Sequence, residues 1–271
     1  MNKFTYTLAA LASIVILASS CSDYNRVLKS DNYGEKFDMA NYLYDSVGTA
    51  SSKVRSIALY EQIYQRSPKQ GEGELAYFRI GKAYYVSGDY YMAGYYLGQF
   101  PQRFPYSPKA EEATFLSAMC AVNNSPEYSL DQMETDVAIN NLQQFVNRYP
   151  NSVLIDSCNN IIDRLRFKLE TKAYESVKLY SKTENYRAAA SSASTFMEDY
   201  PMSIFKEEVH YIYVMNSYYL AKNSIEQKKK ERIEQTIERY STFVAAFPES
   251  DYNRILAGFD DEMRKELKEY Q

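Results

Sequence analysis

A short phrase containing an aromatic residue, a proline and a serine recurs along this chain and constrains its fold more than any other feature. Complete copies end at Ser107, Ser152, Ser203 and Ser250, and a shorter copy surrounds Pro68. Proline stops a helix because it has no amide donor, and serine favours the start of the next helix. The phrase therefore predicts a series of helices that end and restart at regular places.

Upstream of each proline, apolar or small residues recur at helical spacing. Before Pro105, the residues Ala93, Leu97 and Phe100 lie four and three positions apart, which puts them on one face of an α-helix. The equivalent trios are Ser56, Tyr60 and Ile63; Ala138, Leu142 and Phe145; Ala189, Ala193 and Phe196; and Thr236, Tyr240 and Phe243. Five helices with one buried face each are predicted.

A first helix is expected before each of these second helices. Gly81, Tyr84 and Gly88 resemble the small, aromatic and turn positions of the tetratricopeptide repeat, whose period is about 34 residues. We predict an all-α fold, an α-solenoid of about five tetratricopeptide-like helical hairpins plus a C-terminal capping helix at residues 251–270. First helices are expected at residues 35–45, 74–87, 108–122, 153–180 and 204–221, within repeats at 35–68, 74–105, 108–150, 153–201 and 204–248 of a single domain, 35–271.

The N-terminus has the pattern of an export signal. Lys3 precedes an uncharged apolar stretch, residues 4–17, which is too short to span a bilayer, and small residues lead to Cys21. This arrangement resembles the bacterial lipobox, which implies a signal peptide at residues 1–20, acyl chains such as palmitate on Cys21, and a polar, lipidated tether over residues 21–34. The alternative is an ordinary secretory signal with a chance cysteine.

Charge and motif content argue against several functions. The formal net charge is −4, which gives no electrostatic reason to expect nucleic acid. His210 is the one histidine, and no metal-ligand spacing, phosphate-binding loop or nucleophile motif is present. We expect no enzyme activity, catalytic residue, cofactor or metal site.

The remaining polar features have structural interpretations. The carboxylate pairs Glu111–Glu112, Glu207–Glu208 and Asp260–Asp261 are assigned to first turns or outer faces of helices. Lys228, Lys229 and Lys230 are assigned to a solvated helix start or loop within the polar segment 223–231. Cys120 and Cys158 fall in apolar patterns, and whether they are free or bridged stays open.

First helices of a tetratricopeptide solenoid line a groove that binds extended peptides. Side chains one step from the packing positions are expected to point into it, and aromatic rings there make good anchors. Each ring could instead fill the core between hairpins. The substrate-groove candidates are Phe37, Asn41, Tyr44, Phe78, Lys82 and Tyr85, and the partner-surface candidates are Tyr211, Met215 and Tyr218.

The chain resembles the BamD family of outer-membrane assembly lipoproteins in its lipobox, its five hairpins and the phrases at residues 89–93, 144–152 and 221–224. Its high tyrosine content, 28 residues, is similar to that of the Bacteroidetes branch of the family. The resemblance implies a non-catalytic subunit of the β-barrel assembly machinery, held in the outer membrane by Cys21 and facing the periplasm. It further implies that residues 153–246 bind the periplasmic domains of BamA, and that the N-terminal groove binds nascent outer-membrane proteins. The alternatives are another periplasmic tetratricopeptide lipoprotein scaffold, for envelope division or glycan uptake, and an enzyme acting on cell-wall material.

Overall fold

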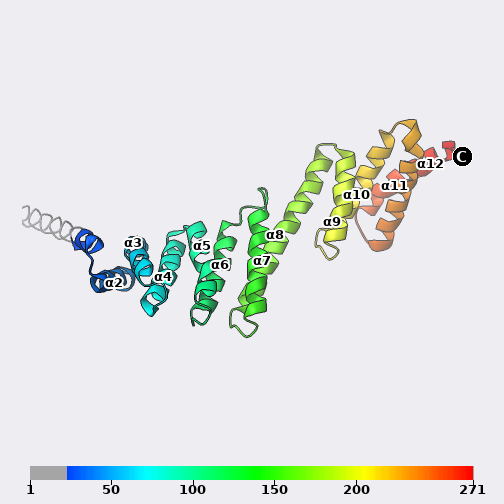
Figure 1. Ribbon diagram of the computed structural model, residues 1–271. Coiled ribbons are helices and arrows are strands. Elements are labelled where there is room, and N and C mark those ends of the chain that lie inside the picture. The colour runs from blue at the N-terminus through cyan, green and yellow to red at the C-terminus, as the bar shows by residue number, and fades with distance from the viewer. Residues whose placement is uncertain (1–22, 271) are drawn as a thin grey trace, which may run out of the picture. The chain divides into compact units, whose positions relative to one another are not determined.

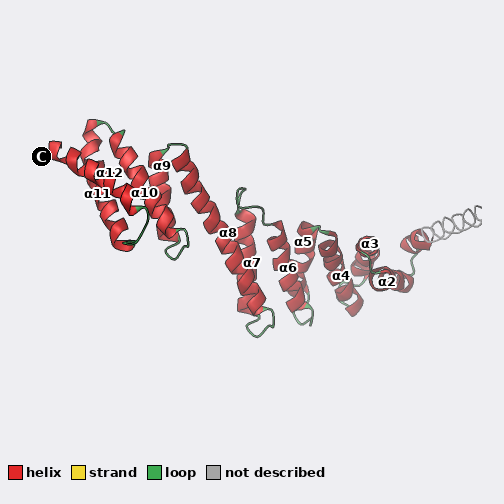
Figure 2. Ribbon diagram, turned by 180° about the vertical axis from the view of Figure 1, so that it is seen from behind, coloured by secondary structure: helices red, strands yellow, loops and turns green. Residues whose placement is uncertain are grey.

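The computed structural model of the protein describes residues 23–270, so the predicted signal peptide and the acylation site Cys21 lie outside the described residues. Every regular element within this range is helical (Figure 2). Residues 23–29 form a short helix. The elements that follow are α2 (Tyr33–Asn41), the π-helix η1 (Tyr42–Val47), α3 (Ala50–Arg66), α4 (Gly71–Ser87), α5 (Tyr90–Arg103), α6 (Ala110–Asn124), α7 (Met133–Arg148), α8 (Ile155–Lys182), α9 (Tyr186–Asp199), α10 (Lys206–Lys222), α11 (Glu226–Ala246), α12 (Asn253–Leu267) and the 3₁₀ turn η2 (Lys268–Tyr270).

Helices that follow one another in the chain are also neighbours in space (Figure 1). In this way α3 packs on α4, α4 on α5, α5 on α6 and α6 on α7, and the same order holds from α9 to α12. This is the predicted all-α architecture of tetratricopeptide-like hairpins. The contacts divide the described chain into two compact units, and the single solenoid over residues 35–271 stays a prediction. Among the described residues, unit 1 comprises 23–127 and 131–162, and unit 2 comprises 128–130 and 163–270, so that the boundary falls within α8.

The recurrent phrase produces the same turn at every second helix. The residues before the five prolines, Ser67, Phe104, Tyr149, Tyr200 and Phe247, share φ values between −124° and −135° and ψ values between 58° and 66°. The proline ring disfavours the α-helical region for the residue before it, although Phe100 before Pro101 stays helical inside α5. The last helical residue therefore lies two positions before each of the five prolines, and the residue between them is the C-cap.

The serine of the phrase caps this turn and not the helix that follows. Ser152 donates its backbone amide to Tyr149 O (3.0 Å), and its Oγ accepts from the amide of Leu154 (3.2 Å). Ser107, Ser203 and Ser250 repeat both contacts. The next helix begins three residues after each of these serines. The serines thus order the turn before the helix, in place of the helix-capping role we expected.

The predicted second-helix trios form the core. All fifteen of their side chains are buried except that of Tyr240, which is half-buried. Phe100, Phe145, Phe196 and Phe243 each contact the aromatic residue four positions later, with ring centroids between 5.1 and 5.3 Å apart. Gly81 lets α4 approach α5, since a Cβ there would lie 2.8 Å from Cγ of Leu97. The same packing is thus repeated in both units.

Three segments differ from the expected boundaries. Residues 23–29 are helical, and Val27 is fully buried, where a polar tether was predicted. The polar segment 223–231 is a loop only up to Ile225, because α11 begins at Glu226 and includes the three lysines. The helix expected at residues 153–180, as one long or broken helix, is the continuous helix α8, which begins and ends two residues later, at Ile155 and Lys182.

The two cysteines of the described chain are free and buried. Cys120 packs in the core of unit 1 beside Ala93 and Leu97, and burial raises the pKa of its thiol to about 12. Burial also raises the pKa of the Cys158 thiol. Both side chains therefore act as small apolar core groups, which resolves the question that the sequence left open.

A substitution pair tests whether the repeated ring is what holds a hairpin together. We expect Phe145→Ala to lower the free energy of unfolding by about 3–5 kcal/mol, because it removes a fully buried ring and leaves a cavity. Tyr106→Ala changes a side chain that is 98% exposed on a turn, and we expect less than about 0.5 kcal/mol. Urea unfolding followed by circular dichroism measures both. Equal losses in the two variants would contradict this account of the core.

Candidate binding surface on the first helices

The first helices of unit 1 place a row of polar and aromatic side chains side by side. We call this the first-helix surface and define it by Asn41, Tyr44, Asp45, Arg79, Lys82, Tyr85 and Glu112. Arg79, Lys82 and Tyr85 follow one another at steps of three along α4, so they share one face of that helix. Their partners come from α2 and η1 before α4 in the chain, and from α6 after it.

Arg79 is the centre of this surface. Its Nη1 donates to Asn41 Oδ1 (2.6 Å) and to the Tyr60 hydroxyl (2.8 Å), and its Nη2 donates to Asp45 Oδ2 (2.8 Å). Tyr60 in turn donates to Asn41 Oδ1 (2.9 Å). The guanidinium also lies 4.7 Å from the ring centroid of Tyr44. One side chain that is 16% exposed thereby connects α2, η1, α3 and α4.

The tyrosines of this cluster stay neutral at physiological pH. Burial raises the pKa of Tyr44 to about 12, although the positive charge of Arg79 opposes the increase. The pKa of Tyr60 is also about 12, because burial outweighs the hydrogen bond from Arg79. Asp45 is then the one carboxylate that bonds to Arg79, and its side chain is 54% exposed.

A second polar contact connects α4 to α6. Lys82 Nζ lies 2.7 Å from Glu112 Oε1 and 5.4 Å from the ring centroid of Phe78. The side chains of Lys82 and Glu112 are 33% and 49% exposed, so water reaches the pair. Tyr85 packs edge-on against Tyr90. Burial raises the pKa of its hydroxyl, and a hydrogen bond with Asn123 of α6 offsets part of this increase. The surface therefore offers rings, a cation and carboxylates within one row.

The structure brings together four of the six groove candidates. Asn41, Tyr44, Lys82 and Tyr85 are half-buried on adjacent first helices. Phe37 is also half-buried and packs against the core around Val27. Phe78 is 5% exposed and packs on Phe100 with ring centroids 5.3 Å apart. Phe78 is therefore a core residue, the alternative that the sequence had left open for each ring.

The three partner-surface candidates of unit 2 are buried to different degrees. Tyr211 stacks on Tyr252 with ring centroids 4.1 Å apart, and Met215 is half-buried. Tyr218 is 4% exposed, stacks on Phe259 at 4.2 Å and donates to Glu262 Oε2 (2.5 Å). Tyr218 does not lie on an open surface, because α12 packs on α10 as the first helix of a further hairpin would. Binding roles for all nine candidates stay predictions.

Sequence reasoning missed Arg79, Asp45 and Glu112 as members of this surface, and the buried Tyr60 as a partner of Arg79. A signal for Arg79 was present, since it is the one charged residue between Leu75 and Ile80 in α4. A charged side chain within an apolar helical run needs partners, and those come from residues 19 to 38 positions earlier in the chain. The partners themselves could not be read from local pattern.

The acidic pairs are more than helix-end charges. Glu112 and Glu208 lie in first turns as predicted, and each also contacts the preceding first helix, Glu208 by accepting from the Tyr174 hydroxyl (2.6 Å). Asp260 differs from expectation, because it is 7% exposed in the middle of α12, where it pairs with Arg264 Nε (2.6 Å). Glu112 and Glu208 therefore connect elements of the stack, and Asp260 pairs within its own helix.

His210 has a structural environment. Its Nδ1 lies 2.8 Å from Lys206 O, and its ring packs edge-on against Phe247. A carbonyl can only accept, so Nδ1 carries the proton, and burial lowers the pKa of the ring.

Lys229, from the lysine cluster, pairs with Glu266 of α12 (2.5 Å). Within residues 23–270 no group of three or more His, Cys, Asp or Glu side chains is arranged to hold a metal ion.

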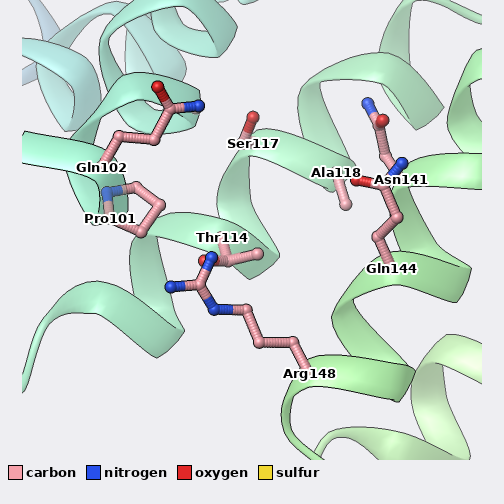
Figure 3. A pocket seen from close by; sticks show the side chains of 9 residues that line it. Pro101, Gln102, Thr114, Ser117, Ala118, Asn141, Gln144 and Arg148 are labelled. Atoms are coloured by element: carbon pink, nitrogen blue, oxygen red, sulfur yellow. The ribbon is translucent and has the colours of Figure 1, made fainter. Parts of the chain in front are cut away.

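Two cavities accompany the helix stack. In unit 1, a cavity of 230 Å³ lies between α5, α6 and α7 and is lined by Gln102, Ser117, Asn141, Gln144 and Arg148 among others (Figure 3). In unit 2, a cavity of 350 Å³ contains His210, Tyr213, Glu238 and Arg239. Amides, hydroxyls and one guanidinium line the first cavity, so it offers hydrogen-bond donors and acceptors to a polar group.

Removing Arg79 tests how much its contacts stabilise unit 1. We expect Arg79→Met to lower the free energy of unfolding by about 2 kcal/mol, because it leaves half-buried polar partners without their donor. Arg79→Lys should recover only part of this, since an ammonium lacks the planar fork.

The matched control is Lys82→Met on the same helix. Its ion pair is more exposed, so the expected loss is less than about 1 kcal/mol. Chemical denaturation of the three variants provides the comparison. A larger effect at Lys82 than at Arg79 would show that the Arg79 cluster is not the stabilising centre of this surface.

Comparison with known proteins places the chain in a family. A sequence model of the YfiO family, described as an outer membrane lipoprotein, matches residues 40–205 and 168–270. Within the described range 23–270, no helix has the length and apolar character needed to cross a membrane.

Two curated relatives are named outer membrane protein assembly factor BamD. The one from Caulobacter vibrioides is 23% identical over 143 residues, which is 53% of this chain and 47% of the relative. The one from Helicobacter pylori is 23% identical over 158 residues, 56% of this chain and 68% of the relative. The similarity thus spans about half the length of the Caulobacter protein. Because the family model covers most of the sequence, the chain belongs to the YfiO family of outer membrane lipoproteins.

Proposed function

We propose that this chain is a non-catalytic, lipid-anchored scaffold of outer-membrane β-barrel assembly. Acyl chains on Cys21 hold it in the outer membrane, and its helical units face the periplasm. Unit 2 binds the periplasmic domains of a BamA-like barrel protein, and the first-helix surface of unit 1 binds nascent outer-membrane proteins. Membership of the YfiO family is the observation that carries this proposal, and the names of the two BamD relatives support its direction.

The chemistry of the first-helix surface suits an extended polypeptide. The side chains of Tyr44 and Tyr85 have few rotamers, so binding would cost little conformational freedom. Both side chains are half-buried, which already orients their rings. Lys82, Asp45 and Glu112 add charges that water still reaches. The neighbouring Tyr42 and Val86 are 57% and 46% exposed on η1 and α4. A strand with alternating aromatic and polar residues has the matching pattern.

The partner part of the proposal is tested by affinity purification of the tagged chain from detergent-solubilised outer membranes. We expect a BamA-like barrel protein to copurify, and depletion of the chain to stop the accumulation of folded barrel proteins. The control is the same tag on the Cys21→Ser chain, which should not remain with the membrane fraction. Recovery of division or glycan-uptake components without a barrel protein, in cells that survive depletion, would contradict the proposal.

The substrate part is tested with a fluorescent peptide of alternating aromatic and polar residues that ends in phenylalanine. Replacing Tyr44 and Tyr85 together with alanine should weaken binding about ten-fold or more, because both rings are lost as anchors. Fluorescence anisotropy gives the affinity, and circular dichroism checks that helicity is kept. Tyr91→Ala is the matched control, since this tyrosine is 70% exposed on the second helix α5. Equal weakening in the control would place the peptide elsewhere.

A further inference from the structure

The helix at residues 23–29 is packed onto the first hairpin of unit 1. Val27 is fully buried in the core that also contains Ala40 and Leu59. The Tyr24 hydroxyl donates to Arg55 O of α3 (2.9 Å), and the Arg55 guanidinium lies 4.2 Å from the Tyr24 ring centroid. One face of this short helix is therefore part of the core.

A buried lysine fastens the other end of the same helix. Lys36 of α2 is 4% exposed, and its Nζ donates to Leu28 O (3.2 Å) and to Gln62 Oε1 of α3. A cation beside the last carbonyls of a helix is favourable because it meets the negative end of the helix dipole. At the surface, Arg26 Nη2 pairs with Glu35 Oε1 (2.7 Å). Releasing the helix would expose Val27 and break the contacts of Lys36.

This packing leaves little chain between the helix and the predicted acyl chains. Cys21 stands two residues before Asp23, and two extended residues span at most roughly 7 Å. An acylated cysteine lies at the headgroup level of a bilayer. Asp23, Asn25, Arg26 and Lys29 are exposed on this helix, and Arg26 pairs with Asp23 (3.8 Å) as well as with Glu35, so the side turned away from the core is polar and carries charges of both signs. Such a face suits contact with phosphate headgroups and not insertion among acyl chains.

We propose that the first hairpin of unit 1, with helix 23–29 packed on it, lies directly against the lipid headgroups and that no flexible tether separates them. This inference rests on the proposed acylation of Cys21. Its partner is the bilayer surface itself. It follows that membrane attachment restrains the orientation of unit 1, because the anchor joins a packed helix and not a free segment.

The test uses the acylated mature chain in vesicles of phosphatidylethanolamine and phosphatidylglycerol, with a nitroxide on Asn25→Cys. Cys120 and Cys158 are buried, so the label goes to the exposed thiol. Power-saturation spectroscopy measures access of a water-soluble nickel complex to the label. We expect access to be at least about three-fold lower than in the non-acylated Cys21→Ser chain mixed with the same vesicles.

Inserting about a dozen Gly and Ser residues between Ser22 and Asp23 should restore full access, because a flexible linker lets the hairpin leave the surface. The same insertion in the loop at residues 125–132 is the matched control and should keep the label protected. Full access in the anchored chain, or protection that survives the insertion before Asp23, would overturn the inference.

Mass spectrometry of Cys21 separates the two proposals. A chain without acyl groups would overturn the lipid anchor and this inference together. An acylated chain with a protected label that copurifies with no barrel protein would support the inference and contradict the proposed role in assembly.

Discussion

The structure depends on how each second helix ends. The proline disfavours the α-helical region for the residue before it, and at the ends of α5, α7, α9 and α11 that residue is aromatic and packs on a phenylalanine one turn earlier. The chain therefore reverses its direction one turn after the most deeply buried side chains of the helix, since Phe145 and its three equivalents are at most 2% exposed. The same few residues thus set both the helix end and the core contact, although the spacing between the prolines varies from 37 to 51 residues.

This coupling explains what could be predicted from the sequence. The second-helix trios repeat at helical spacing, and all but Tyr240 are buried, since burial on one face needs only local periodicity. Phe78 and Tyr218 were predicted to line surfaces and are buried instead, because Phe100 covers the first and α12 covers the second. What covers a side chain depends on an element distant in sequence. The helix at residues 23–29 was missed for the same reason, since its polar sequence holds only Tyr24, Val27 and Leu28 for packing.

The first-helix surface also shows that contacts between residues distant in the sequence could not be predicted. Asn41, Tyr44, Lys82 and Tyr85 were found by their distance from packing positions, but the residue that organises them, Arg79, was not. Its partners lie on α2, η1 and α3, and only the folded hairpins bring them within hydrogen-bonding distance. A cation held by an amide, a hydroxyl and a carboxylate gives this surface fixed donors and rings before any partner arrives. Less conformational freedom then remains to be lost on binding.

The choice between phenylalanine and tyrosine follows from this need for partners. Phenylalanine fills the buried places at the ends of α5, α7, α9 and α11, where a hydroxyl would need a hydrogen-bond partner of its own. Tyr60 is equally buried, and its hydroxyl is held by Asn41 and Arg79. Elsewhere tyrosine hydroxyls join neighbouring hairpins, as Tyr174 does with Glu208 and Tyr96 with Glu61. With 28 tyrosines and no tryptophan, the chain uses tyrosine both to pack apolar surface and to form hydrogen bonds between hairpins.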